Sequence, residues 1–401
     1  MEAIVRPLDI RLSRQSWLSK FFSVCWVVGI LGMAFWAYER SHNEARAMFS
    51  YLFSFMTVLS LALGCLIFVL IHHATRAGWS VVIRRVPETV IALLPLFALL
   101  FIPIWYSTDI LYSWTHAAPH DEILKAKAPY LNTAFFTVRS VLYFVVWSTL
   151  GILYYRWSVA QDGKKNQQLT RKMWRLSPIG IIIFGLSASF AAFDWLMSLQ
   201  PHWFSTIFGV YFFAGCILSG IAFITLMCVA LQSCGVLNRS MTSEHYHDLG
   251  KLLFGYTVFW AYIGFSQFML IWYANLPEET EFYLHRLHHG WEYISWALPL
   301  TNFFLPFFIL MSRHIKKKKA VMIFMCLWIL TTHFMDIYWL VLPGFVDDHG
   351  FSHLDIQLVD IACLFGMMAL FLGCFGFLFK RNDAMPTGDS RLPESLSFEN
   401  F

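Results

Sequence analysis

Two carboxylates, Asp194 and Asp336, lie inside long apolar stretches of this 401-residue chain, where ionisable side chains are rare. Each stands seven residues before a proline, Pro201 and Pro343 respectively. A charged side chain is costly in a membrane, so such residues usually pair with each other, carry protons or line a path. The matching positions therefore indicate one polar point in each half of a duplicated helical bundle.

Other ionisable residues accompany the two aspartates. Arg139 is expected at about the depth of Asp194 in the neighbouring helix, so an ion pair that locks two helices competes with a titrating carboxylate. His333 and Asp336 are one helical turn apart and can pass protons, because histidine titrates near neutral pH. We therefore predict a proton-accessible half-path on the outer side. The candidates within or at the ends of apolar segments are Arg139, Asp194, Glu292, His333, Asp336 and Asp360.

A histidine-rich segment offers a weaker candidate, a metal site. His285, His288 and His289 precede Glu292 at helical spacing, a composition compatible with zinc. Because the segment is an outer loop with Gly290 at the helix start, a docking surface or proton-collecting patch is the favoured interpretation. No C-x-x-C, haem-attachment or P-loop motif is present. His333 is the only central histidine, which argues against an intramembrane haem.

The composition requires these residues to be positioned by membrane helices. The chain is 58% hydrophobic and 13% charged, against about 25% charged in soluble domains. Crossing the hydrocarbon core takes about 20 apolar residues. Ten segments meet that length, and no alternating β-barrel strands are visible. The predicted spans are 17–38, 47–71, 88–106, 131–155, 178–200, 203–231, 250–275, 290–312, 320–342 and 356–379.

Positive charge predicts the topology. With the N-terminus inside, the inner segments hold 23 of the 29 Lys and Arg residues, and the outer loops hold Arg40, Arg46, Lys125, Lys127 and Arg286. Both termini are therefore expected in the cytoplasm. Basic clusters such as Arg171-Lys172 are interpreted as topology signals and contacts with anionic membrane lipids, not as nucleic-acid sites. The inner half of the membrane looks dry in sequence.

We predict one all-α integral membrane domain over 1–401. Spans two to five (47–200) and six to nine (203–342) form two parallel-repeat four-helix bundles, and spans one and ten flank them. The tails, 1–16 and 381–401, are cytoplasmic. Within this frame, Pro95 and Pro103 should kink the third span, and the Gly215/Ser219 spacing should let two helices approach closely.

The segment 193–215, FDWLMSLQPHWFSTIFGVYFFAG, resembles membrane subunits of the polysulfide-reductase (NrfD-like) family. Its most specific part, Thr206 to Tyr211, and the later segment 333–343, HFMDIYWLVLP, look like the F subunit of alternative complex III. That complex is a bacterial respiratory quinol:cytochrome c oxidoreductase. Asp194 and Asp336 match the family's intramembrane acids; no other role is carried over.

The resemblance implies a cofactor-free, non-redox subunit in the bacterial inner membrane that is not active alone. Quinol would be the substrate of the complex, and haem c and iron–sulfur clusters would sit in partner subunits. The implied partners are a homologous quinol-binding membrane subunit, a periplasmic multihaem cytochrome c, an iron–sulfur subunit and, as a further candidate, a terminal oxidase. The F-type subunit would support the electron-transport complex structurally and contribute to proton translocation.

Two alternatives stay open. The chain can hold its own periplasmic-side quinol pocket near Asp194, Trp195 and His202. It can also be a stand-alone secondary transporter, because inward-facing acids and an internal repeat are compatible with that class.

Overall fold

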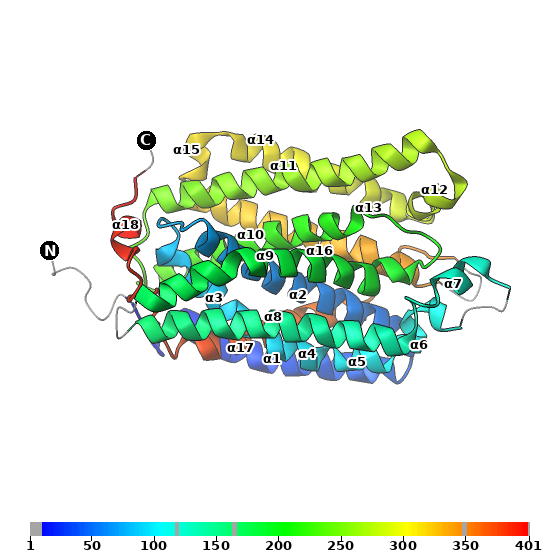
Figure 1. Ribbon diagram of the computed structural model, residues 1–401, viewed down its shortest axis with the longest axis horizontal. Coiled ribbons are helices and arrows are strands. Elements are labelled where there is room, and N and C mark those ends of the chain that lie inside the picture. The colour runs from blue at the N-terminus through cyan, green and yellow to red at the C-terminus, as the bar shows by residue number, and fades with distance from the viewer. Residues whose placement is uncertain (1–9, 117–119, 163–166, 347–350, 400–401) are drawn as a thin grey trace.

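The computed structural model describes residues 10–116, 120–162, 167–346 and 351–399, and all regular secondary structure in them is helical. Ten helical segments there are long and apolar enough to cross a membrane, which confirms the all-α prediction and its ten spans. They run side by side along the long axis of the molecule (Figure 1). Single helices form seven of them: α1 (Trp17–Arg40), α2 (Glu44–Ala74), α8 (Thr133–Gln161), α10 (Phe208–Ser233), α11 (Ser243–Ala274), α16 (Lys319–Val341) and α17 (Leu358–Phe379).

The third and eighth spans are interrupted helices, and the fifth is a helix that, like α16, continues into a 3₁₀ turn. The third comprises α3 (Arg85–Ile91), α4 (Leu94–Leu100) and α5 (Ile102–Tyr106), and the breaks beside Pro95 and Pro103 confirm the predicted kinks. The fifth, α9 (Gln167–Trp195), is extended by a 3₁₀ turn. The eighth, α13 (Trp291–Leu298) and α14 (Leu305–Met311), is joined by a π-helical segment that the sequence did not reveal.

We name the two ends of the molecule by the predicted topology. The outer end carries α6 (Thr108–Leu111), α7 (Glu122–Lys127) and α12 (Pro277–Leu284), and the inner end carries α15 (Arg313–Lys316) and α18 (Leu392–Leu396). Membrane insertion, this orientation and the two-bundle repeat remain predictions.

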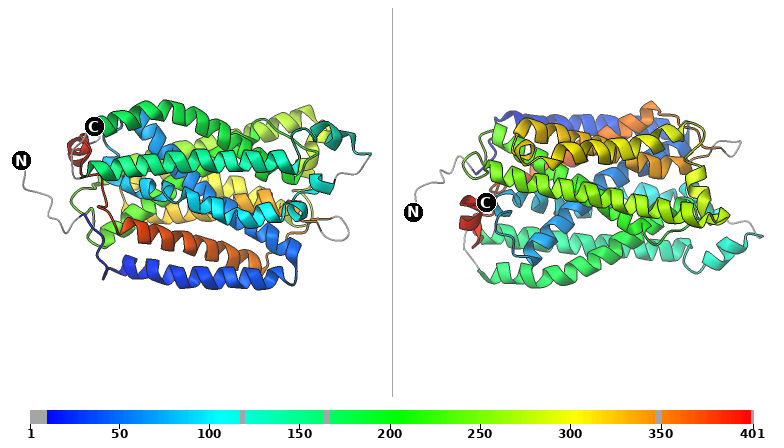
Figure 2. Two further views of the ribbon diagram at one scale, coloured as in Figure 1. Left: turned by 60° about the horizontal axis from the view of Figure 1, so that its bottom comes forward. Right: turned by 90° about the horizontal axis from the view of Figure 1, so that it is seen from above.

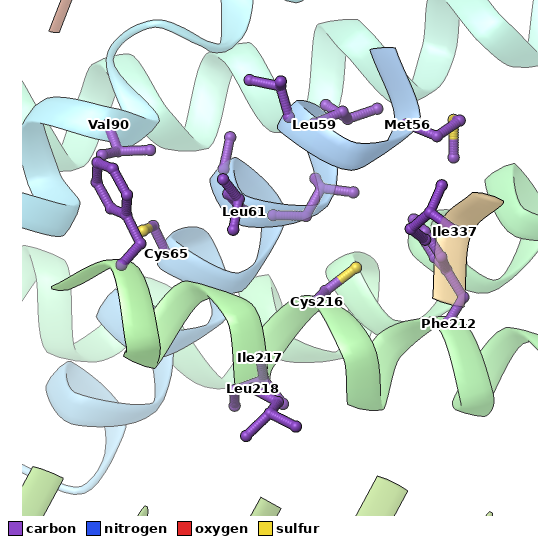
Figure 3. Close-up of a cluster of buried hydrophobic side chains, with 14 of the residues drawn as sticks. Met56, Leu59, Leu61, Cys65, Val90, Phe212, Cys216, Ile217, Leu218 and Ile337 are labelled. Carbon is purple, nitrogen blue, oxygen red and sulfur yellow. The ribbon is translucent and has the colours of Figure 1, made fainter. Parts of the chain in front are cut away.

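The core of the molecule is the pair α2 and α10. In the most apolar 18-residue window of each helix, 94% of the residues are buried in α2 and 83% in α10, against 22% in α1. The two helices nearly touch: a Cβ on Gly64 would lie 1.8 Å from the carbonyl oxygen of Cys216. Gly220 supplies the other side of this contact, and Figure 3 shows the surrounding apolar side chains. The close approach expected at Gly215/Ser219 is therefore made one residue further along α10, at Cys216 and Gly220.

The first and last spans form a separate pair beside the core. α1 packs along α17, as two views show (Figure 2). Gly32 and Gly366 face each other, since a Cβ on Gly32 would lie 2.6 Å from the Cα of Gly366. These two helices thus pack together and against the core helix α2.

Candidate functional site

The first buried acid, Asp194, forms an ion pair with Arg139. Asp194 stands near the end of α9 and is fully buried, while Arg139 lies in α8 and is 6% exposed. The guanidinium donates from Nε to Oδ2 at 2.8 Å and from Nη2 to Oδ1 at 2.9 Å. This bidentate geometry confirms the pairing of Arg139 with Asp194 and makes it a strong link between the two helices.

The remaining bonding capacity of this pair is also occupied. The hydroxyl of Tyr143 donates to Asp194 Oδ2 at 2.7 Å, and Arg139 Nη1 donates to the carbonyl oxygen of Tyr130 at 2.9 Å. The Tyr130 ring lies 3.8 Å from the guanidinium carbon. Asp194 is therefore a saturated, charge-compensated site, which fits the helix-locking interpretation.

The second acid, Asp336 in α16, has a different environment. It is 2% exposed, and its hydrogen bonds come from neutral groups: the Tyr211 hydroxyl donates to Oδ1, and Trp260 Nε1 donates to Oδ2 at 3.2 Å. Among the described residues no Lys, Arg or His forms an ion pair with it. The two acids match in sequence position but not in charge compensation.

His333 does not form the expected hydrogen-bonded relay with Asp336. Its Nε2 lies 2.7 Å from the Ser60 hydroxyl of α2. Both residues nevertheless border Gly215: a Cβ there would lie 3.1 Å from the His333 ring and 3.9 Å from Asp336 Oδ2. Gly215 therefore leaves space between α10 and the polar face of α16, which explains why a small residue stands there.

A cavity lies on the far side of the Asp336 donors. It has a volume of about 510 Å³, is open at its surface and is lined by residues of α10, α11, α12, α13, the π-helical segment and α16. Tyr211 and Trp260 line it, and Gln267, Tyr283 and Ser295 add polar groups to a largely apolar wall. Its size falls within the range of small-molecule sites. Tyr211 and Trp260 therefore contact both this space and the carboxyl group.

Arg286 lies in the segment that the sequence predicts as an outer loop, but its side chain is buried against the last turn of α16. It is 2% exposed and donates to the carbonyl oxygens of Trp339 at 3.1 Å and Leu340 at 3.3 Å, in the last turn of α16. Burial lowers its pKa to about 9, against the opposing effect of Tyr283 and Tyr211, so it stays charged at neutral pH. Arg286 thus stabilises a helix C-terminus instead of an acid.

Asp360 forms a third buried polar site, at the start of α17. It accepts from Arg46 and Ser50 and from the backbone N–H of Gln357 at 3.0 Å. Arg46 was assigned to an outer loop from the sequence, but it lies in the first turn of α2 and is 3% exposed. The Arg46–Asp360 pair ties the last span to the core helix.

The other predicted residues have local roles. Glu292 accepts from the backbone N–H of Gly290 at 2.8 Å, at the start of α13. His202 is hydrogen-bonded to Asp121 at 2.6 Å, and the backbone N–H of Leu124 and this histidine lower the pKa of Asp121. The structure therefore does not use His202 as a partner of Asp194.

The histidine-rich loop shows no metal centre. His285 lies 3.4 Å from Glu281, and the ring of His289 lies 4.8 Å from that of His353. In the part of the chain that the structure describes, no group of three or more His, Cys, Asp or Glu is arranged to hold a metal ion. All eight cysteines are free thiols.

The inner end of the molecule holds a further polar network. Glu88 of α3 accepts from Arg84 Nε at 2.9 Å and from the Ser158 hydroxyl at 2.5 Å, and Arg84 also pairs with Asp389 of the C-terminal tail. Arg85 forms a second pair with Asp162, at 2.6 Å. The segment 382–399 thus lies against the inner end of its own chain.

These contacts divide the polar residues by what they can do. Asp194, Asp360 and Glu88 are fixed by arginines, whereas Asp336 is free of a permanent counter-charge and lies beside a cavity. Among the buried acids that the structure describes, only Asp336 therefore combines neutral partners with nearby open space. A scan against protein-family models finds no matching family, and a search of curated proteins finds no significant match.

Proposed function

We propose that this chain is a cofactor-free integral subunit of a respiratory quinol:cytochrome c oxidoreductase. In this role it packs beside a homologous quinol-binding subunit and contributes to a proton path. The proposal rests on the motifs at 193–215 and 333–343 and on ten helices suited to a membrane. The observation that carries the proton role is the environment of Asp336. A carboxyl group held only by neutral donors can take up and release a proton without breaking an ion pair.

In this proposal the two bundles have different tasks. Arg139–Asp194 holds α8 to α9 as a charge-compensated pair. Asp336 is the titrating group, with Tyr211 and Trp260 as its hydrogen-bond partners. His333 and Ser60 extend the polar region from α16 to α2.

The first test is assembly. A tag on this chain should retrieve a multihaem cytochrome c and an iron–sulfur protein from mild detergent. Purification as a lone, active transporter would instead favour the secondary-transporter alternative.

The second test measures protons in the purified complex. Asp336→Asn keeps the acceptor for Tyr211 and removes the titrating group, so quinol turnover should persist while proton release per electron falls. Thr331→Val, on the exposed side of the same helix, serves as the matched control. Unchanged proton release in Asp336→Asn would remove Asp336 from the path.

Binding of quinol by this chain itself is a second candidate function. The structure favours a pocket beside Asp336 over the one expected near Asp194. Asp194 and Trp195 are fully buried and His202 is bonded to Asp121, whereas the 510 Å³ cavity reaches the donors of Asp336. Gly264 of α11 lines this cavity, so Gly264→Leu should fill it and prevent labelling by a photoreactive quinone analogue. Gly255→Leu, on the same helix with nothing within 4 Å, is the control. Labelling confined to the homologous subunit would exclude this pocket.

A further inference from the structure

A second cavity, of about 490 Å³, lies at the inner end, where α2 ends, α9 begins and the C-terminal tail crosses. Neither the proposed proton path nor the quinol pocket uses it. The charged residues that line it are mostly positive, with five arginines and a single carboxylate. The charged lining residues are Arg76, Arg84, Arg171, Arg175, Arg391 and Asp389.

The only acid in the lining is already neutralised. Asp389 pairs with Arg84 and accepts from the backbone N–H of Arg391 at 2.9 Å. Arg84 in turn donates to Glu88. The other four arginines form no ion pair with any carboxylate in the described part of the chain. Four guanidinium groups around one confined space create a strong positive potential that an anion would satisfy.

The remaining lining groups suit a phosphate at a membrane surface. Arginine presents a planar fork of donors that matches phosphate oxygens. His73 is 4% exposed, and its Nε2 has no hydrogen-bond partner. The guanidinium of Arg76 lies 3.7 Å above the ring of Trp174, near the start of a predicted span. Tryptophan at this position is typical of the interface between lipid and water.

We propose that this inner-end cavity binds a phosphate group. An anionic phospholipid of the inner leaflet and a soluble phosphate compound share this chemistry. The tail contributes Asp389, Ser390 and Arg391 to the lining, so the site is complete only when the tail is docked. The cavity is formed by this chain alone, so the inference does not depend on the proposed function.

The lipid arm of the test uses the full chain in nanodiscs that contain phosphatidylcholine with a minor fraction of phosphatidylglycerol. Native mass spectrometry should show phosphatidylglycerol enriched on the released protein. Arg171 and Arg175 are exposed, so Arg171→Gln/Arg175→Gln should fold normally. One surface arginine changes attraction to anionic lipid by about fivefold, so the double variant should lose roughly 25-fold in enrichment.

The matched control removes the same charge elsewhere. Arg156→Gln/Lys172→Gln changes two exposed basic residues of the same inner region that do not line the cavity. Because it leaves all five lining arginines in place, its enrichment should stay well above that of the cavity variant. Arg391→Gln, from the tail, should weaken binding like a cavity variant.

The soluble arm titrates inorganic phosphate into the full chain in an uncharged detergent and follows Trp174 fluorescence. Saturable binding that Arg171→Gln/Arg175→Gln abolishes, without lipid selectivity, would identify a soluble phosphate as the ligand. Enrichment of phosphatidylglycerol without phosphate binding would identify the lipid. The proposal fails if neither probe binds, or if the control variant loses binding as much as the cavity variant.

Discussion

Replacing Asp194 by Asn should destabilise the protein more than the same replacement at Asp336. Asp194→Asn leaves Arg139 charged and 6% exposed, with its two strongest acceptors gone. Removing one partner of a buried ion pair costs about 3–5 kcal/mol. Asp336→Asn leaves no buried cation and keeps an oxygen that can accept from Tyr211 or Trp260, so the expected loss is about 0.5–1.5 kcal/mol, one ordinary hydrogen bond.

The free energy of unfolding can be compared by titrating the purified full chain with dodecyl sulfate and following tryptophan fluorescence. The double variant Arg139→Gln/Asp194→Asn removes both charges and should recover at least half of the loss of Asp194→Asn. Equal losses at the two aspartates would refute the distinction between a locked and an unpaired acid. A double variant as unstable as Asp194→Asn would show that the buried charge is not the cause.

Two further predictions concern packing and the tail. Gly64→Ala should force α2 and α10 apart, because its Cβ would lie 1.8 Å from the Cys216 oxygen, and no folded protein should be seen in gel filtration. A Cβ added at Gly185 would have nothing within 4 Å, so Gly185→Ala should be neutral or stabilise the protein by up to about 1 kcal/mol. Burial alone would raise the pKa of Asp389, but Arg84 and the Arg391 backbone N–H outweigh it and hold that pKa below the usual value. This contact therefore stabilises the docked tail above about pH 4 and is lost at lower pH. Asp389→Asn should make the tail sensitive to carboxypeptidase at pH 7, and a tail that stays protected would contradict the role of this pair.

The sequence was sufficient to predict those features that depend on the residues of a single helix. The ten spans follow from apolar length, and the breaks at Pro95 and Pro103 follow from proline chemistry. The Arg139–Asp194 pair was predictable because both residues lie at similar depth in consecutive spans. Each of these predictions needed only local pattern and approximate depth.

Contacts between distant segments could not be predicted in the same way. Arg46 was read as a loop charge, although its spacing with Ser50 and Ser54 continues a polar stripe along α2 that pointed inward. Nothing in the sequence placed its partner Asp360, 314 positions away. Asp389 and Arg84 are separated by 305 positions, and the tail's short apolar segment around Met385 was the only hint that it docks.

The pairing of α1 with α17 has a consequence for biosynthesis. α1 has few protein contacts other than those with α17, because only 22% of its most apolar window is buried. The backbone N–H of Ala384, beyond α17, also donates to the carbonyl of Ile10, ahead of α1. During translation α1 is made long before α17, so we expect it to lack its main partner until α17 has followed. A nascent chain arrested before α17 should leave α1 accessible to crosslinking by lipid-soluble reagents, and the finished chain should protect it along the face that carries Gly29 and Gly32.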